Sequence, residues 1–145
     1  MRRVRKHPRL GMTLLEMSVA ITVIGILVAF SIPSFIRVSE QSHVDAAAQY
    51  LRSIWSAERV YWLENRTFAD SFAALDSLGL IDPKVAIGND GYFTYSITGV
   101  TSDSFTVHAI RGGSDRWSGT LTITQDGQVT GFVSGSGVVF VPPDI

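Results

Sequence analysis

The 145-residue chain contains no cysteine, which excludes disulfide bonds, a thiolate nucleophile and a cysteine-ligated zinc site. It has 12 Lys and Arg residues, but five of them precede Gly11, in a leader that carries no acidic residue. Without that leader, 7 basic side chains would face 13 acidic ones, a formal side-chain charge of −6. Because nucleic-acid phosphates are bound by Lys and Arg, no nucleic-acid partner is predicted.

Side chains that could form a catalytic or metal site are sparse and scattered. The three histidines are far apart, and no Ser-His-Asp arrangement is suggested by spacing. The "GNDG" stretch at 88–91 lacks the alternating oxygen ligands of an EF-hand loop and is predicted to be a turn. "RGGSDRW" lacks the Lys-Ser/Thr pair of a phosphate-binding loop. Asn65-Arg66-Thr67 fits a glycosylation sequon, a match that is common by chance. We therefore predict no enzyme, no cofactor and no metal.

The chain does contain one long apolar segment, in which Glu16 is the only ionisable side chain between Met12 and Ile36. This length suffices for a membrane-spanning helix, which needs about 20 apolar residues. The basic leader predicts a single pass through the cytoplasmic membrane with the C-terminal domain outside. The alternative function is a binding module, either anchored in the membrane by this segment or secreted after a signal cut behind Ser31. The helical pattern continues well beyond Ser31 and favours the anchor.

Glu16 requires an explanation, because an unpaired carboxylate in hydrocarbon costs a few kcal/mol. Cleavage after Gly11 would create an α-amino group on Met12, four residues away and about 6 Å along a helix axis. An ammonium and a carboxylate offset each other's cost when they pair. If the amine belongs to a neighbouring copy, the pair would set the axial register of packed helices. We therefore predict that Glu16 is an assembly residue.

The run "GMTLLEMSVAITVIGILVAFSIPSF" resembles the class III signal and N-terminal helix of type IV pilins and of type II secretion pseudopilins. The leader ends in Gly11, Met12 stands where that family usually has Phe, and Glu16 is the fifth residue after the glycine. The resemblance implies that a prepilin peptidase cuts after Gly11 and methylates the amine of Met12. It also implies a homo-oligomeric helical filament, either a pilus or a periplasmic pseudopilus, built on an assembly platform in the cytoplasmic membrane.

Two further residues of this segment are predicted to serve assembly. Gly25 permits close approach between helices, as small residues do in membranes. Pro33 lacks a backbone donor and predicts a kink, at the position where the family has its proline. The predicted organisation is a cleaved leader at 1–11, a hydrophobic transmembrane and assembly helix at 12–36, and a globular head at 37–145.

Beyond Pro33 the helical pattern becomes amphipathic and is predicted to end near Asn65. The predicted apolar stripe comprises Val44, Ala47, Ala48, Leu51, Ile54, Trp55, Tyr61 and Trp62. The interleaved charges are Glu40, Asp45, Arg52, Arg59 and Glu64. A short second helix is predicted to begin after Asp70 or Ser71 and to stop at Gly79, with Pro83 beyond its end.

The C-terminal part predicts four short strands, at Tyr92–Thr98, Phe105–Ile110, Gly119–Thr124 and Gln128–Phe132. Asp126-Gly127 indicates a two-residue hairpin turn between the last two. The predicted fold is therefore α+β, with the long N-terminal helix packed against a small antiparallel sheet, as in a pilin head. The loops at 88–91 and 111–118 are expected to face outward and to carry any partner specificity. The chain departs from the family in lacking the pseudopilin calcium ligands and the paired cysteines of many pilins.

Overall fold

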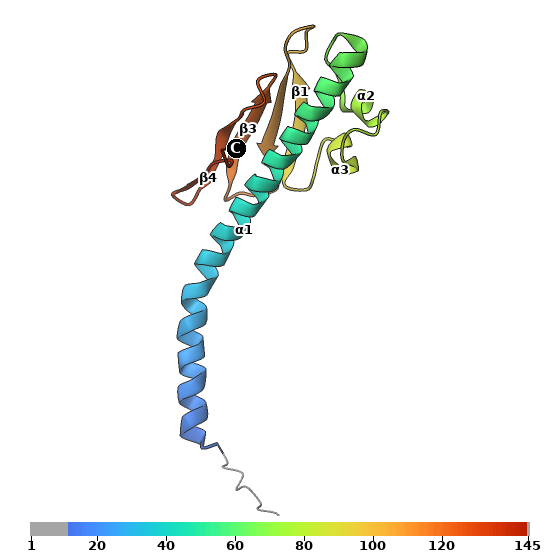
Figure 1. Cartoon of the computed structure of the whole chain (residues 1–145). Coiled ribbons are helices and arrows are strands. Elements are labelled where there is room, and N and C mark those ends of the chain that lie inside the picture. Colours follow the sequence, from blue (N-terminus) through green and yellow to red (C-terminus); the bar gives the residue numbers. More distant parts are fainter. Residues whose placement is uncertain (1–11, 145) are drawn as a thin grey trace, which may run out of the picture. The chain divides into compact units, whose positions relative to one another are not determined.

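The computed structural model describes residues 12–144, so Gly11 lies outside the described residues (Figure 1). Its helices are α1 (Leu14–Asn65), α2 (Phe72–Asp76) and α3 (Pro83–Ala86). Its strands are β1 (Phe93–Thr98), β2 (Thr106–Arg111), β3 (Ser118–Thr124), β4 (Val129–Gly135) and β5 (Val138–Phe140). The chain divides into two compact units, up to Val38 and from Ser39 onward, and we describe each by itself.

The second unit, which we call the head, contains the sheet. All neighbouring strands pair antiparallel in the order β1-β2-β3-β4-β5, a simple meander. Alternation along β2 buries Val107 and Ala109, and the register pairs them with Ile123 and Leu121 of β3. Because successive side chains of a strand point to opposite faces, these residues form one apolar face. The predicted α+β class is confirmed.

The apolar face of the sheet shares a core with the C-terminal part of α1. Tyr50 of α1 meets Tyr95 of β1 edge to face, with ring centroids 6.2 Å apart. The sheet also buries Phe93 and Val133. From α1, the fully buried residues of the predicted stripe are Val44, Ala47, Ala48, Leu51 and Ile54. This part of the predicted core is therefore confirmed, and the head has a hydrophobic core of its own.

The sequence predicted the first four strands of the sheet but not its C-terminal end. The strands β1 to β3 begin and end within one residue of the predicted bounds, whereas β4 runs on to Gly135. The fifth strand, β5, was missed. Only three residues long, it pairs with the extension of β4 across a tight turn at Ser136 and Gly137, both with positive φ. Three residues are too few for an alternating pattern to be recognised.

One turn prediction was wrong in detail. The β3–β4 connection is a four-residue loop, and only Gly127 in it has a positive φ, of +80°. A two-residue type I′ turn needs positive φ at both central residues, which Asp126 does not adopt. Pro83 lies beyond the end of α2, as predicted, and it is also the first residue of α3. Asp82 caps that helix by accepting a hydrogen bond from the Lys84 N–H, which suits a proline at the first helical position.

The loop at 111–118 is not the exposed loop that the sequence predicted. Arg111 belongs to β2 and only 8% of it is exposed, while Trp117 is buried against Phe140 with ring centroids 5.1 Å apart. The alternation of β2 explains Arg111, because it lies on the same face as Val107 and Ala109. Only the segment 112–116 between these two buried residues connects β2 to β3 outside the core.

Candidate functional site

At the N-terminal end of α1, Thr13 and Glu16 form reciprocal hydrogen bonds. The Glu16 carboxylate accepts hydrogen bonds from the N–H of Thr13 at 2.8 Å and from its hydroxyl at 2.9 Å. In return the Thr13 hydroxyl oxygen accepts the N–H of Glu16 at 3.2 Å. This arrangement is a capping box, which satisfies N–H groups that a helix start leaves free. It gives Glu16 a local role that the sequence analysis missed, although Thr-x-x-Glu before an apolar run is the sequence signal for it.

Between Leu14 and Ile32 the other polar side chains are also satisfied within the helix. The hydroxyl of Ser18 donates to the carbonyl of Leu15, that of Thr22 to Ser18, and that of Ser31 to Leu27. Such bonds to a carbonyl three or four residues earlier leave no free donor on the helix surface. Since hydrocarbon offers no partner to a polar group, this segment suits a membrane despite its hydroxyls.

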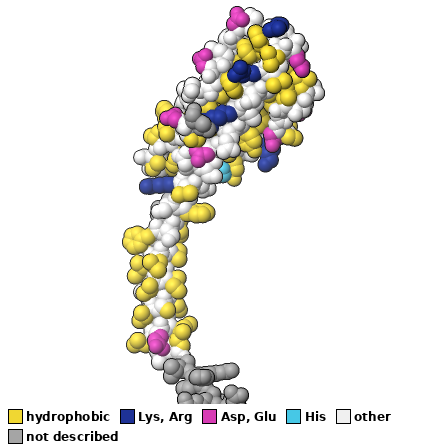
Figure 2. Space-filling view, viewed as in Figure 1, with side chains coloured by type: hydrophobic (Ala, Val, Ile, Leu, Met, Phe, Trp, Pro, Cys, Tyr) yellow, Lys and Arg dark blue, Asp and Glu magenta, His cyan; other side chains and the backbone are white. Residues whose placement is uncertain are grey.

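The apolar side chains of the same segment are uncovered. Leu14 is 90% exposed and Met12 70%, and the large apolar side chains as far as Ile32 are all exposed. An 18-residue window of α1 has a mean hydropathy of 2.4, and none of it is buried. Hydrophobic side chains follow this part of α1, whereas charged and polar ones are spread over the head (Figure 2). A surface this apolar marks a site of contact with membrane or protein.

Met12, Glu16, Gly25 and Pro33 therefore lie on or at the start of one helix, as predicted. A Cβ added to Gly25 would meet nothing within 4 Å, so this glycine leaves a gap on the open helix surface. The helix continues through Pro33 without ending. It also continues through Ser31, where the alternative secretory cut would fall. The roles of these residues in processing and assembly stay predictions.

In the head, a buried ion pair joins α1 to the sheet. Arg111 Nε lies 2.6 Å from Glu40 Oε1, and its Nη2 lies 3.0 Å from Oε2, a two-point contact. Arg111 Nη1 also donates to the carbonyl oxygens of Tyr92 and Gly112. Only 3% of Glu40 is exposed. Glu40, which was predicted as one of the charges interleaved with the apolar stripe, is therefore buried with the core.

Glu58 is a second buried carboxylate of the head, with no exposed surface. Its Oε2 accepts a hydrogen bond from the N–H of Ala69 at 2.8 Å, while Oε1 has no partner among residues 12–144. Burial raises the pKa of Glu58 from 4.5 to about 7, against the opposing effect of the Ala69 hydrogen bond. Through this hydrogen bond, Glu58 holds the segment that follows α1 against the helix.

The oxygen-rich "GNDG" stretch forms a turn. Asp90 Oδ1 accepts the N–H groups of Tyr92 and Phe93, and its Oδ2 accepts the Tyr95 hydroxyl at 2.7 Å. The side-chain oxygen of Asn89 accepts the N–H of Gly91. These oxygens are used in folding the loop. No group of three or more potential metal ligands occurs among residues 12–144.

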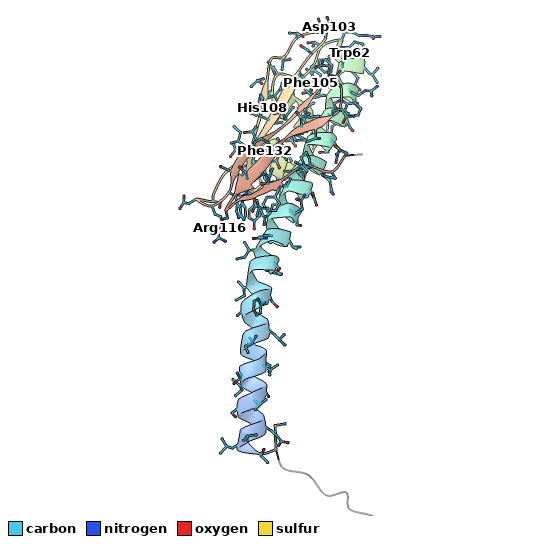
Figure 3. The ribbon with its side chains drawn as sticks, turned by 90° about the vertical axis from the view of Figure 1, so that its left-hand side faces the viewer. Trp62, Asp103, Phe105, His108, Arg116 and Phe132 are labelled. Carbon is cyan, nitrogen blue, oxygen red and sulfur yellow. The ribbon has the colours of Figure 1, made fainter. Side chains whose placement is uncertain are left out.

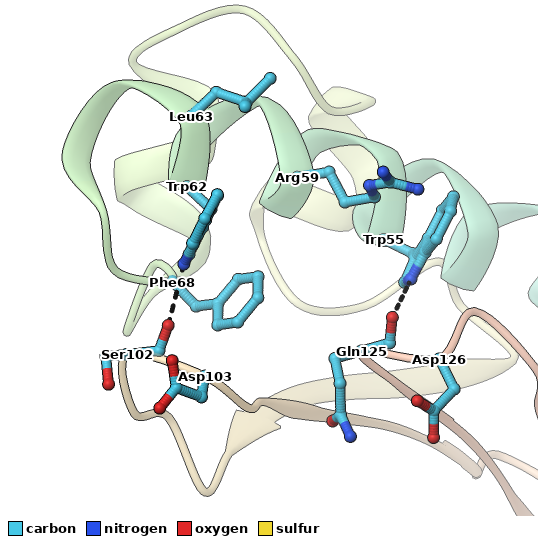
Figure 4. Close-up of a pocket in the computed structure, with 9 residues that line it drawn as sticks. All are labelled: Trp55, Arg59, Trp62, Leu63, Phe68, Ser102, Asp103, Gln125 and Asp126. Carbon is cyan, nitrogen blue, oxygen red and sulfur yellow. Dashed lines mark hydrogen bonds between the residues drawn. The ribbon is translucent and has the colours of Figure 1, made fainter.

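At one end of the head lies a cleft of about 500 Å³, which we call the distal pocket (Figure 4). Trp55 and Trp62 of α1 form two of its walls, each half-buried rather than part of the core as predicted. Their indole N–H groups donate to the carbonyl oxygens of Gln125 and Ser102, respectively. The pocket is also lined by Arg59, Phe68, Asp103 and Asp126.

Together these features define a small α+β protein with an uncovered apolar N-terminal helix that is suited to a membrane or to other helices. Residues 6–32 match the family model of the prokaryotic N-terminal methylation motif. This match spans Gly11, Met12, Glu16 and Gly25.

Three curated proteins resemble a larger part of the chain. The type IV narrow pilus major component PilA5 of Thermus thermophilus is 32% identical over 117 residues, which cover 79% of this chain and 95% of the relative. The type IV wide pilus major component PilA4 of the same organism is 27% identical over 107 residues, which cover 74% and 77%. The type IV major pilin protein PilA of Myxococcus xanthus is 34% identical over 71 residues, which cover 48% and 32%.

The chain therefore belongs to the type IV pilin family. The predicted resemblance is confirmed, and so is the prediction that the protein is not an enzyme, because its relatives are structural components of pili.

Proposed function

We propose that this protein is the subunit of a type IV pilus that polymerises through its N-terminal helix. The observation that supports this most directly is the pairing of the methylation motif with an apolar helix that is uncovered in the single chain. The three relatives are all major components of pili, which favours a pilus over a secretion pseudopilus. The proposed partners are further copies of the chain, an assembly platform and a prepilin peptidase.

The proposed order of events begins in the cytoplasmic membrane. Residues 12–36 span it once, with the basic leader 1–11 inside and the head 37–145 outside. The peptidase cuts after Gly11 and the amine of Met12 is methylated. The cut also frees that amine to pair with Glu16 of a neighbouring subunit, which offsets the cost of burying either charge. Gly25 then admits a neighbouring helix, and Pro33, without its N–H, loosens the helix where it must adapt.

Mass spectrometry of the mature protein tests the processing step. We expect the first residue to be N-methyl-Met12. A mature terminus at Ile32 would instead indicate the secreted binding module and contradict the proposal. Filaments sheared from the cell surface should contain the chain as their main component, whereas a periplasmic pseudopilus would leave the sheared fraction empty.

Glu16 variants separate the amine pair from the capping box. Glu16→Gln keeps an oxygen that can accept the Thr13 N–H but removes the charge, and Glu16→Ala removes both. If the amine pair drives assembly, both variants should be processed normally and both should lose most filaments, by roughly tenfold or more. Wild-type filament yield from Glu16→Gln together with loss in Glu16→Ala would show that only the cap matters.

A further inference from the structure

The distal pocket has the chemistry of a guanidinium site. Two indoles and Phe68 supply aromatic surface, and Asp103 and Asp126 add two carboxylates at its edge (Figure 4). Arg59 lies over the Trp55 ring at 4.8 Å, so the pocket lining carries a formal charge of −1. A guanidinium combines a flat face that stacks on aromatic rings with N–H groups that match a carboxylate.

The carboxylates of the pocket have capacity left for such a partner. Within the described part of the chain, the Asp103 side chain accepts no hydrogen bond. Asp126 accepts only a long one, 3.4 Å from the Thr124 hydroxyl. The indole N–H groups, by contrast, already donate to backbone carbonyls and fix the two rings in place. The pocket is thus rigid on its aromatic side and open on its acidic side.

The head also carries a suitable arginine, at its opposite end. Arg116 is exposed on the segment 112–116, far from Trp62 and Asp103 along the head (Figure 3). Trp117, buried next to it, holds the segment in place. Of the six Lys and Arg residues from Ser39 onward, four already contact a carbonyl, a carboxylate or an aromatic ring: Arg52, Arg59, Arg66 and Arg111.

We propose that the distal pocket of one subunit receives Arg116 of a second copy of this chain. The inference rests on the proposed function, because copies that polymerise through their N-terminal helices all point the same way. The end of one head with Arg116 then meets the end of the next head with the pocket. Such a head-to-tail contact can repeat from subunit to subunit along a filament. The incoming guanidinium lies beside Phe68 and bonds to Asp103, because Arg59 and Arg66 already lie over the Trp55 and Trp62 rings. This contact adds a second link between subunits to that of the helices.

Cross-linking tests the contact, and a chain without cysteine gives no background. Filaments of the full chain carrying Asp103→Cys and Arg116→Cys together are treated with a short bis-maleimide. We expect a ladder of dimers, trimers and higher species on a denaturing gel. Either single variant should stay monomeric or stop at a dimer. The pair Asp103→Cys with Lys84→Cys is the matched control, because Lys84 is also exposed and basic. Filaments without a ladder, or an equal ladder in the control, would overturn the proposal.

Charge reversal gives an independent readout if the cysteine variants assemble poorly. Asp103→Arg and Arg116→Asp should each lower filament yield by roughly tenfold, and the two together should restore most of it. Lys84→Asp changes the charge equally and should not restore the filaments that Asp103→Arg loses. Normal filaments from Arg116→Asp would contradict the contact while leaving the proposed function intact. Absence of filaments from the unmodified chain would instead contradict the proposed function.

Discussion

Glu16, Glu40 and Glu58 lie on one helix, and each carboxylate has a different partner. Glu16 bonds to the N–H of Thr13, Glu40 to a buried arginine, and Glu58 to a single backbone N–H. A carboxylate buried with one oxygen unpaired is held in its neutral form more readily than one that faces a guanidinium. Burial therefore brings the pKa of Glu58 to about 7, within the physiological pH range.

Glu58 should make the stability of the head depend on pH. Its pKa is 4.5 when unfolded and about 7 when folded, so the folded state binds the proton more tightly. The resulting stabilisation is present below pH 4.5 and is lost as the pH rises through 7, by up to about 3 kcal/mol. Urea unfolding of the full chain in detergent, at pH values from 5 to 8, measures it. Glu58→Gln should flatten the curve over this range, and an unchanged slope would assign the dependence to another group.

At the scale of elements, the apolar pattern of α1 also indicates on which side of the helix two of its carboxylates lie. Glu40 and Glu58 stand four residues before Val44 and four after Ile54, the ends of the buried stripe, so helical spacing alone places both carboxylates on the core side. Their partners could not be predicted. Arg111 and Ala69 come from other parts of the chain, and only the folded sheet and the turn after α1 bring them to the helix.

The same distinction applies to the N-terminal segment and to the pocket. The positions of Met12, Glu16 and Gly25 on a helix follow from local spacing, and they were predicted. The distal pocket combines Trp62 of α1 with Asp103, which lies between β1 and β2, so no local pattern contains it. Long-range contacts of this kind depend on strand register, which a single sequence does not determine.

The ion pair between α1 and β2 predicts a strongly asymmetric set of variants. Arg111→Ala leaves Glu40 buried without its partner and should lower the free energy of unfolding by about 3 to 5 kcal/mol. Glu40→Leu with Arg111→Met removes both charges and keeps the volume, so it should cost much less. A double-mutant cycle by urea denaturation measures the difference. A loss in the double variant equal to the sum of the two single-variant losses would show that the two side chains do not act as a pair.

On the scale of the whole molecule, the two units have different stabilising contacts. The head buries its own apolar residues, from Val44 to Phe140, and has its own ion pair. The segment from Leu14 to Ile32 satisfies its polar groups internally but leaves its apolar side chains uncovered. Substitutions in that segment should therefore leave the head folded and change only what the helix contacts in membrane or filament.

Variants of Gly25 test whether substitutions in the N-terminal segment leave the head unaffected. A Cβ added at this position meets no atom within 4 Å in the described part of the chain. Gly25→Leu should thus insert into the membrane normally and leave the head's unfolding unchanged, yet lower filament yield by roughly tenfold, because neighbouring helices can no longer approach as closely. Gly25→Ala, which adds one methyl group, should have a smaller effect. The unmodified chain and the two variants are compared by membrane fractionation, by urea unfolding and by the yield of sheared filaments. These three measurements distinguish effects on membrane insertion, on folding of the head and on assembly. Normal filaments from Gly25→Leu would exclude close helix contact at this position, and loss of membrane insertion would place the role of Gly25 before assembly.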